Sequence, residues 1–202
     1  MSSKNSLTDD AHEVSCAIDL IELGARMQVL EGELTLPRDR MLELYREVKG
    51  VSPPKEIPPC SADWYMTWLA NIHASLFYNT YAFLTQEAGS SRLDALATGY
   101  RLYLEHCRNS NVEAILSFTR AWSLVRFFDA DMLQVAECCH CSGKFVAHKQ
   151  ASQANGVCGA CGPSSPPAPG IFRLKTSRVT DRYWKYRCRR NYPRCHGHEP
   201  GR

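Results

Sequence analysis

The 202 residues, of which 44% are hydrophobic, suffice to bury a core, and this length predicts one main domain with room for a small module. No apolar run reaches the roughly 18 residues that cross a bilayer, and the first ten residues lack the basic and apolar pattern of a signal peptide. We therefore expect a cytoplasmic protein with no membrane contact, which excludes the membrane-spanning and secreted classes.

Charge is unevenly distributed along the chain. The formal net charge is +3, yet residues 171–202 hold ten basic and two acidic side chains and so carry +8. Residues 1–170 carry the remaining −5. A basic segment of this kind indicates a polyanionic partner such as nucleic acid.

The first fifty residues predict two amphipathic helices, at residues 11–30 and 38–49, from apolar side chains at helical spacing. A basic second helix after a short connection is typical of a helix-turn-helix, here near residues 14–49. An ordinary helix pair with a solvated charged face predicts the same pattern, so both interpretations stay open. The candidate DNA contacts, which lie off the apolar stripe, are Arg38, Arg40, Arg46 and Lys49.

Further helices are predicted beyond a proline-rich segment, residues 51–60, which cannot be helical. Their ranges are residues 63–85, 91–107 and 112–134, and the first is apolar over so much of its circumference that we expect it to be buried. His73 in that helix is interpreted as a core residue with a hydrogen-bond partner. Residues 1–135 are therefore predicted to form a multi-helix domain that binds a partner.

Four of the ten cysteines form two CxxC pairs with sixteen residues between them. In a cytosolic protein this spacing is typical of zinc ribbons rather than of disulfides. Four thiolates favour zinc and leave no coordination position open, so we expect one structural zinc ion per chain. A redox CxxC pair or an iron–sulfur cluster would use the same residue type. The expected ligands are Cys138, Cys141, Cys158 and Cys161.

The predicted zinc module covers residues 136–162 and contains short β-prone segments, such as residues 144–147. Cys139 competes with Cys138 for the metal, and His140 and His148 offer nitrogen ligands. The CxxC register through Cys138 is favoured because a CxC pair strains the turn. The other cysteines and histidines are interpreted as unliganded: Cys16, Cys60, Cys107, Cys188, Cys195, His196 and His198.

Residues 163–202 are predicted to form a proline-rich linker and then a basic tail with interspersed aromatic residues. Positive charge beside aromatic rings is typical of nucleic-acid contacts, although a merely solvated tail has the same composition. The candidate DNA contacts in the tail are Arg173, Lys175, Arg178, Arg182 and Lys185. We find no grouping of nucleophile, base and oxyanion donors, so we do not expect an enzyme.

Separate blocks of residues 11–161 resemble one family, the flagellar transcriptional activators called FlhC. The blocks are 22–26 (ELGAR), 44–45 (LY), 52–55 (SPPK), 63–64 (DW), 66–68 (MTW), 73–75 (HAS), 100–105 (YRLYLE), 119–122 (TRAW), 124–127 (LVRF) and both CxxC pairs. The chain departs from the family pattern at Glu56, at Cys60 and throughout the tail after Pro163.

The resemblance implies a mainly α fold with zinc bound by the four CxxC cysteines. It also implies a hetero-oligomer of two FlhC and four FlhD subunits that binds flagellar promoter DNA and recruits RNA polymerase. It implies nothing for the tail. Two functions therefore stay open: a DNA-binding subunit of a transcription activator, or an interaction subunit that stabilises a DNA-binding partner without touching DNA itself.

Overall fold

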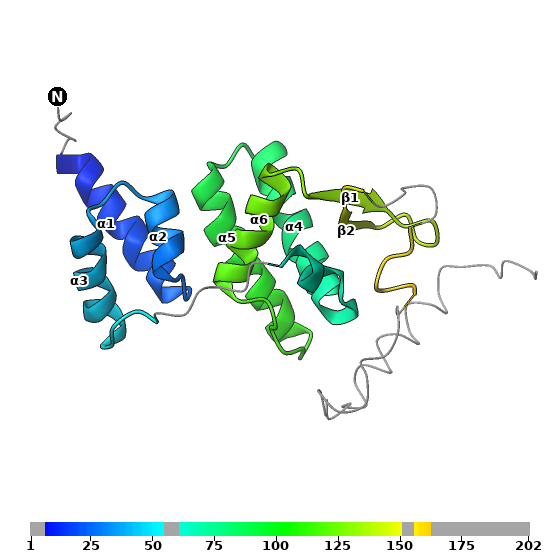
Figure 1. Ribbon diagram of the computed structural model, residues 1–202, viewed down its shortest axis with the longest axis horizontal. Coiled ribbons are helices and arrows are strands. Elements are labelled where there is room, and N and C mark those ends of the chain that lie inside the picture. The colour runs from blue at the N-terminus through cyan, green and yellow to red at the C-terminus, as the bar shows by residue number, and fades with distance from the viewer. Residues whose placement is uncertain (1–6, 55–60, 151–155, 163–202) are drawn as a thin grey trace, which may run out of the picture. The chain divides into compact units, whose positions relative to one another are not determined.

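The computed structural model describes residues 7–54, 61–150 and 156–162, which belong to one compact unit, residues 1–165. The described part is mainly helical, and a small two-stranded sheet follows the helices (Figure 1). This confirms the predicted fold class. None of the described helices is both long and apolar enough to span a membrane. The elements are α1 (Leu7–Glu22), α2 (Met27–Glu33), α3 (Arg38–Lys49), the 3-10 helix η1 (Ala62–Met66), α4 (Trp68–Gln86), α5 (Arg92–Asn109), α6 (Phe118–Asp129), β1 (Leu133–Glu137) and β2 (Lys144–His148).

The single helix predicted over residues 11–30 is wrong, because the chain breaks between α1 and α2. Gly24 has a φ of +89°, a conformation that glycine adopts at little cost. The N–H of Ala25 bonds to the carbonyl of Leu20 at 2.9 Å, and the N–H of Gly24 bonds to that of Ile21 at 3.0 Å. These two bonds form a Schellman motif, which ends α1. As a result, α2 and α3 flank a four-residue connection, residues 34–37, and α1 packs against α3.

The second predicted helix, residues 38–49, is confirmed as α3. Gly50 ends it in the left-handed conformation with a φ of 70°, and its N–H bonds to the carbonyl of Arg46 at 2.8 Å. Met41 and Tyr45 are buried on one side of the helix. The amphipathic pattern therefore located both the helix and its inner face.

Two of the later helices are shorter than predicted. Thr67 has an extended ψ of 144°, which divides residues 62–86 into η1 and α4. The helix predicted over residues 112–134 is wrong in its extent: α6 begins only after Ser117, whose side chain accepts the N–H of Arg120 at 3.3 Å, and β1 has begun at Leu133. β1 thus spans the predicted domain boundary between residues 135 and 136.

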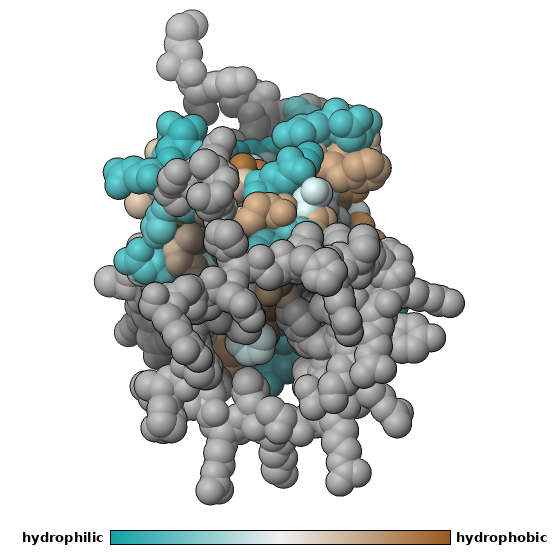
Figure 2. Space-filling model, turned by 90° about the vertical axis from the view of Figure 1, so that its right-hand side faces the viewer, coloured by the Kyte–Doolittle hydropathy of each residue, from teal (hydrophilic) through white to brown (hydrophobic). Residues whose placement is uncertain are grey.

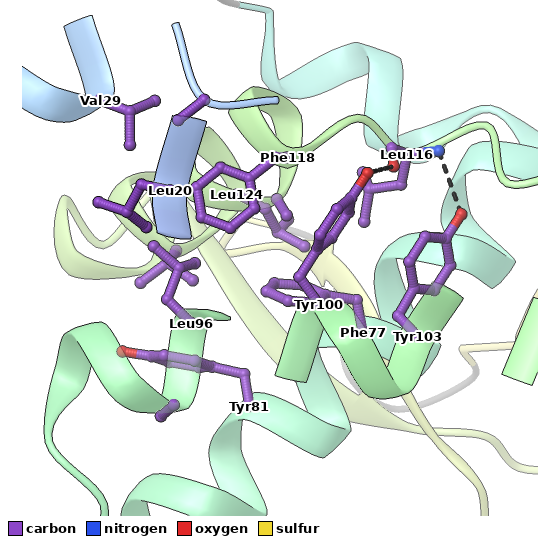
Figure 3. Packing of buried hydrophobic residues seen from close by; sticks show 14 of the residues in the cluster. Leu20, Val29, Phe77, Tyr81, Leu96, Tyr100, Tyr103, Leu116, Phe118 and Leu124 are labelled. Carbon is purple, nitrogen blue, oxygen red and sulfur yellow. Dashed lines mark hydrogen bonds between the residues drawn. The ribbon is translucent and has the colours of Figure 1, made fainter. Parts of the chain in front are cut away.

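Tyrosine hydroxyls explain why the chain before α6 is not helical (Figure 3). Tyr100 donates to the carbonyl of Leu116 at 3.0 Å, and the N–H of Leu116 donates to the Tyr103 oxygen at 3.1 Å. Both main-chain groups of Leu116 are therefore bonded to side chains of α5 rather than to a helix. Around them, Phe77, Tyr100 and Phe118 pack with leucines of α1, α5 and α6 in the hydrophobic core.

His73 is a core residue with a hydrogen-bond partner, as predicted. It is only 4% exposed, and its Nδ1 lies 2.7 Å from the Tyr103 hydroxyl. Burial, with a smaller contribution from His106, lowers the pKa of His73 to about 4. His73 is therefore neutral at physiological pH.

Candidate metal centre

The two strands form an antiparallel hairpin that places the first cysteine pair at its turn. Val135 lies opposite Val146, and Glu137 lies opposite Lys144. Beyond the strands, the N–H of Cys138 bonds to the carbonyl of Gly143 at 3.0 Å. Ser142 adopts a left-handed φ of 55°, and its N–H returns to the Cys138 carbonyl at 2.8 Å. Cys138 and Cys141 are thereby held on one tight turn.

The second cysteine pair occupies a similar turn beside the first. The N–H groups of Cys161 and Gly162 both bond to the carbonyl of Cys158, at 3.0 and 3.1 Å. None of the glycines in the two cysteine turns has a positive φ. They supply space instead: a Cβ on Gly159 would lie 3.2 Å from the side chain of Ile72 and from the carbonyl of Trp68.

The four sulfur atoms converge. The Sγ atoms of Cys138, Cys141, Cys158 and Cys161 lie within 4.8 Å of one another, and those of Cys141 and Cys158 are 3.7 Å apart. Tetrahedral zinc with bonds of about 2.3 Å would hold its sulfurs about 3.8 Å apart. The cluster could therefore hold a metal ion, and its size and ligand type fit a cation that prefers thiolate ligands.

Local hydrogen bonds prepare one thiol for ionisation. Burial raises the pKa of Cys138, but backbone N–H groups of Cys158 and His140, each 3.4 Å from its Sγ, and of Cys141 outweigh it and lower the pKa to about 6. At Cys161, burial and the neighbouring thiols of Cys141 and Cys158 raise the pKa instead. Four crowded thiols of this kind ionise together only when a cation compensates their charge.

The competing ligands lie elsewhere. Cys139 is exposed and is not among the four converging sulfurs. His148 Nε2 lies 3.1 Å from a carboxylate oxygen of Asp63. Cys107 is buried, and Cys16 is half-buried with its Sγ 3.7 Å from His12 Nδ1. Cys60, Cys188, Cys195, His196 and His198 lie outside the described residues.

A row of α4 side chains binds the hairpin and the second cysteine turn, which sequence reasoning missed. Asn71 Nδ2 donates to the carbonyl of Val146 at 2.7 Å, and Ser75 Oγ accepts the N–H of Val146 at 3.0 Å. Asn79 donates to the carbonyl of Lys144 at 2.9 Å, and Trp68 Nε1 donates to that of Gly159 at 2.8 Å. The bonds to Val146 and Lys144 occupy the edge of β2 that faces away from β1, so α4 substitutes for a third strand. The only signal was polar residues at helical spacing on an apolar helix.

Close to this row, Trp68, Phe145 and Val157 contribute to the lining of a hollow of about 210 Å³. Figure 2 faces the hairpin end of the described chain and shows hydrophobic surface exposed among hydrophilic groups. Val157 is one of the exposed large hydrophobic residues.

The four predicted DNA contacts of α3 are all exposed, but they differ in their surroundings. Arg38 forms an ion pair with Glu31, and Lys49 donates to the carbonyl of Glu22 at 3.3 Å. Arg40 and Arg46 form no ion pair within the described ranges. The tail candidates Arg173, Lys175, Arg178, Arg182 and Lys185 lie outside the described residues.

Comparison with known proteins agrees with the resemblance of the sequence blocks. The profile of the family described as flagellar transcriptional activator (FlhC) matches residues 1–170. The flagellar transcriptional regulator FlhC of Paraburkholderia phymatum is 70% identical over 156 residues, which cover 77% of this chain and 71% of the relative. Those of Variovorax paradoxus and Proteus mirabilis are 51% and 46% identical, each over 77% of this chain and over 77% and 81% of their own lengths. The chain therefore belongs to the FlhC family of flagellar transcriptional activators, a family of regulators rather than of enzymes.

Proposed function

We propose that this chain is the DNA-binding subunit of a cytoplasmic complex of four FlhD and two FlhC subunits, which binds flagellar promoters and activates transcription through RNA polymerase. Membership of the FlhC family supports the regulatory role and the FlhD partner. Two copies of the chain in one complex would suit a promoter with two related half-sites.

The observation that carries the DNA contact is the set of exposed arginines on α3. Together, α2, the four-residue connection and α3 form a helix pair that α1 packs against, an arrangement in which the last helix can enter the major groove. Arg40 and Arg46 have no carboxylate partner within the described residues and are available for base edges or phosphates. Arg38 and Lys49 already bind groups within the chain, so we expect them to contribute less to DNA binding. The tail arginines and lysines would add phosphate contacts.

A second function is favoured by the acids on the same helix. Asp39, Glu43 and Glu47 are exposed on α3 together with Arg40 and Arg46. A surface of mixed charge suits a protein partner, and carboxylates repel DNA phosphates unless they read bases. On this alternative, α3 would bind another subunit, and the chain would stabilise a DNA-binding partner.

We further propose that the four clustered cysteines hold one structural zinc ion per chain. When bound, zinc supplies a closed tetrahedral link between the two cysteine turns and no open position for a reacting water. Their spacing and the pKa of Cys138, lowered to about 6, support thiolate ligation.

Binding of the purified complex to promoter and to random DNA tests the proposal. We expect Arg40→Ala and Arg46→Ala to weaken promoter binding more than random binding, whereas Arg38→Ala and Lys49→Ala have smaller effects. Each lost base contact should cost about 1 to 3 kcal/mol. If the complexes of all four variants bind promoter DNA like the wild type, α3 does not contact DNA. If the variants instead no longer assemble with FlhD, the interaction-subunit alternative is correct.

A further inference from the structure

Glu33, the last residue of α2, connects the N-terminal helices to the rest of the fold. Its Oε1 accepts a 2.6 Å hydrogen bond from the indole N–H of Trp122 on α6. The Glu33 side chain is only 10% exposed, so water competes poorly for this bond. Hydrogen bonds to charged groups are about twice as strong as those between neutral groups. This is a directed contact between two elements 89 residues apart in sequence.

The neighbouring residues leave this contact little freedom. A Cβ on Gly32 would lie 3.0 Å from Cζ2 of Trp122, so the end of α2 rests directly against the indole ring. Arg92 at the start of α5 lies 3.8 Å from the second Glu33 oxygen, and its guanidinium bonds to Asp129 at the end of α6 at 2.6 Å. We call Glu33, Trp122, Arg92 and Asp129 the Glu33 clamp.

The clamp lies close to α3 in sequence and fixes the end of the helix that precedes it. Only residues 34–37 separate Glu33 from α3, so the position of α3 follows from that of the end of α2. Among the described residues, Asp19 and Arg101 form a further ion pair between the N-terminal helices and α5, and their side chains are 54% and 48% exposed. Exposed ion pairs of this kind fix geometry weakly.

We propose that Glu33 is a positioning residue for promoter recognition, because the clamp holds α2 and α3 in one orientation relative to the remainder of each subunit. This inference rests on the proposed function, in which α3 contacts DNA. Base readout requires side chains to be placed within fractions of an ångström, whereas phosphate attraction tolerates displacement. Loss of the clamp should therefore reduce specificity rather than general DNA binding.

Paired variants of the full chain, co-purified with FlhD, separate this role from a merely structural one. Glu33→Ala and Trp122→Phe each remove the hydrogen bond, and we expect promoter affinity to fall by roughly 5- to 100-fold while affinity for random DNA changes less than about twofold. Glu33→Gln keeps an oxygen that accepts the indole N–H, so its promoter affinity should stay within about threefold of that of the wild type. Asp131→Asn, which breaks the 2.7 Å ion pair with Lys149 outside the clamp, is the matched control and should change neither affinity.

Two results would overturn the inference. Equal losses on promoter and random DNA would show that the clamp only supports folding, and unchanged promoter affinity in Glu33→Ala and Trp122→Phe would show that it does not position α3. If Glu33→Ala fails to fold, the comparison of Trp122→Phe with Glu33→Gln shows whether the hydrogen bond positions α3. Failure of the proposed function is distinguishable, because Arg40→Ala and Arg46→Ala would then also leave promoter binding intact.

Discussion

The hairpin module, meaning β1, β2 and the two cysteine turns, and the N-terminal helices α1–α3 are attached to the central helices by different chemistry. Side chains of α4 bond to backbone groups of the module at Val146, Lys144 and Gly159. The N-terminal helices are held by contacts between side chains, such as that of Trp122 with Glu33. Apolar packing contributes to both attachments.

This difference determines what each attachment depends on. On the module's side, bonds to backbone require only that the module keeps its folded shape, which we propose to depend on a metal ion held by the four cysteines. Bonds between side chains depend on individual residues at both ends. Substitution of Glu33 or Trp122 should therefore disturb the N-terminal attachment selectively, whereas loss of a metal ligand should disturb the attachment of the module.

The largest expected effect is that of removing a metal ligand. Cys138→Ser or Cys158→Ser should release the ion and unfold the module, because structural zinc contributes on the order of 10 kcal/mol to such sites. The helical signal should persist at a lower unfolding temperature, since α4 loses its backbone partners. Cys139→Ser is the control and should keep one zinc per chain. Full metal content in Cys138→Ser with none in Cys139→Ser would show that the register is wrong.

The contribution of His73 to the pH dependence of stability tests the packing of the central helices. The pKa of His73 is about 4 in the folded chain and 6.5 when unfolded, so the unfolded state binds the extra proton first. The stability that depends on neutral His73 is complete above pH 6.5, is lost as pH falls towards 4, and amounts to about 3 kcal/mol. Denaturant unfolding of His73→Gln should show a flatter pH dependence than the wild type, while the exposed His12→Gln keeps it. Equal slopes in all three would refute the buried neutral histidine.

A smaller effect is expected when one backbone-directed bond of α4 is removed. Asn71 donates to the carbonyls of both Tyr65 and Val146, so Asn71→Ala removes two buried hydrogen bonds at a cost of about 2 kcal/mol. Asn79→Ala removes one bond at a more exposed site and should cost less than about 1 kcal/mol. Urea unfolding of the metal-loaded chain measures both. A larger loss in Asn79→Ala would contradict the assigned roles.

The smallest effect concerns the exposed pair of Asp19 and Arg101. Asp19→Asn should change the free energy of unfolding by less than about 1 kcal/mol and leave promoter affinity nearly unchanged. Comparison with Glu33→Ala under the same conditions shows whether the buried clamp or the exposed pair positions α3. A larger loss of promoter affinity in Asp19→Asn would assign that role to the exposed pair.

The sequence predicted local features well and tertiary ones poorly. Periodicity located α3 and its end at Gly50, and CxxC spacing located the four converging cysteines. The break at Gly24 was missed because the apolar pattern continues across it, although a glycine in that position is a recognised end signal. The late start of α6 was not predictable from local sequence, since it depends on hydroxyls of Tyr100 and Tyr103 that reach Leu116 only in the folded chain.

The α4 row and the Glu33 clamp were missed for the same reason. Asn71, Ser75 and Asn79 are ordinary polar residues until β2 lies beside them, and Glu33 is an ordinary helix-end acid until Trp122 approaches. Hydrogen bonds between distant segments leave almost no trace in periodicity or spacing. The N-terminal attachment therefore became visible only in the folded structure.

Site-specific photocrosslinking to a labelled promoter fragment tests the central claim, that α3 contacts DNA, most directly. A crosslinking residue would replace Arg46, or Glu105 on the exposed side of α5 as a control, in the complex with FlhD. We predict crosslinks to the promoter from position 46 and none from position 105. Crosslinks from position 46 to FlhD alone, with the promoter still bound, would contradict the claim and identify the chain as an interaction subunit.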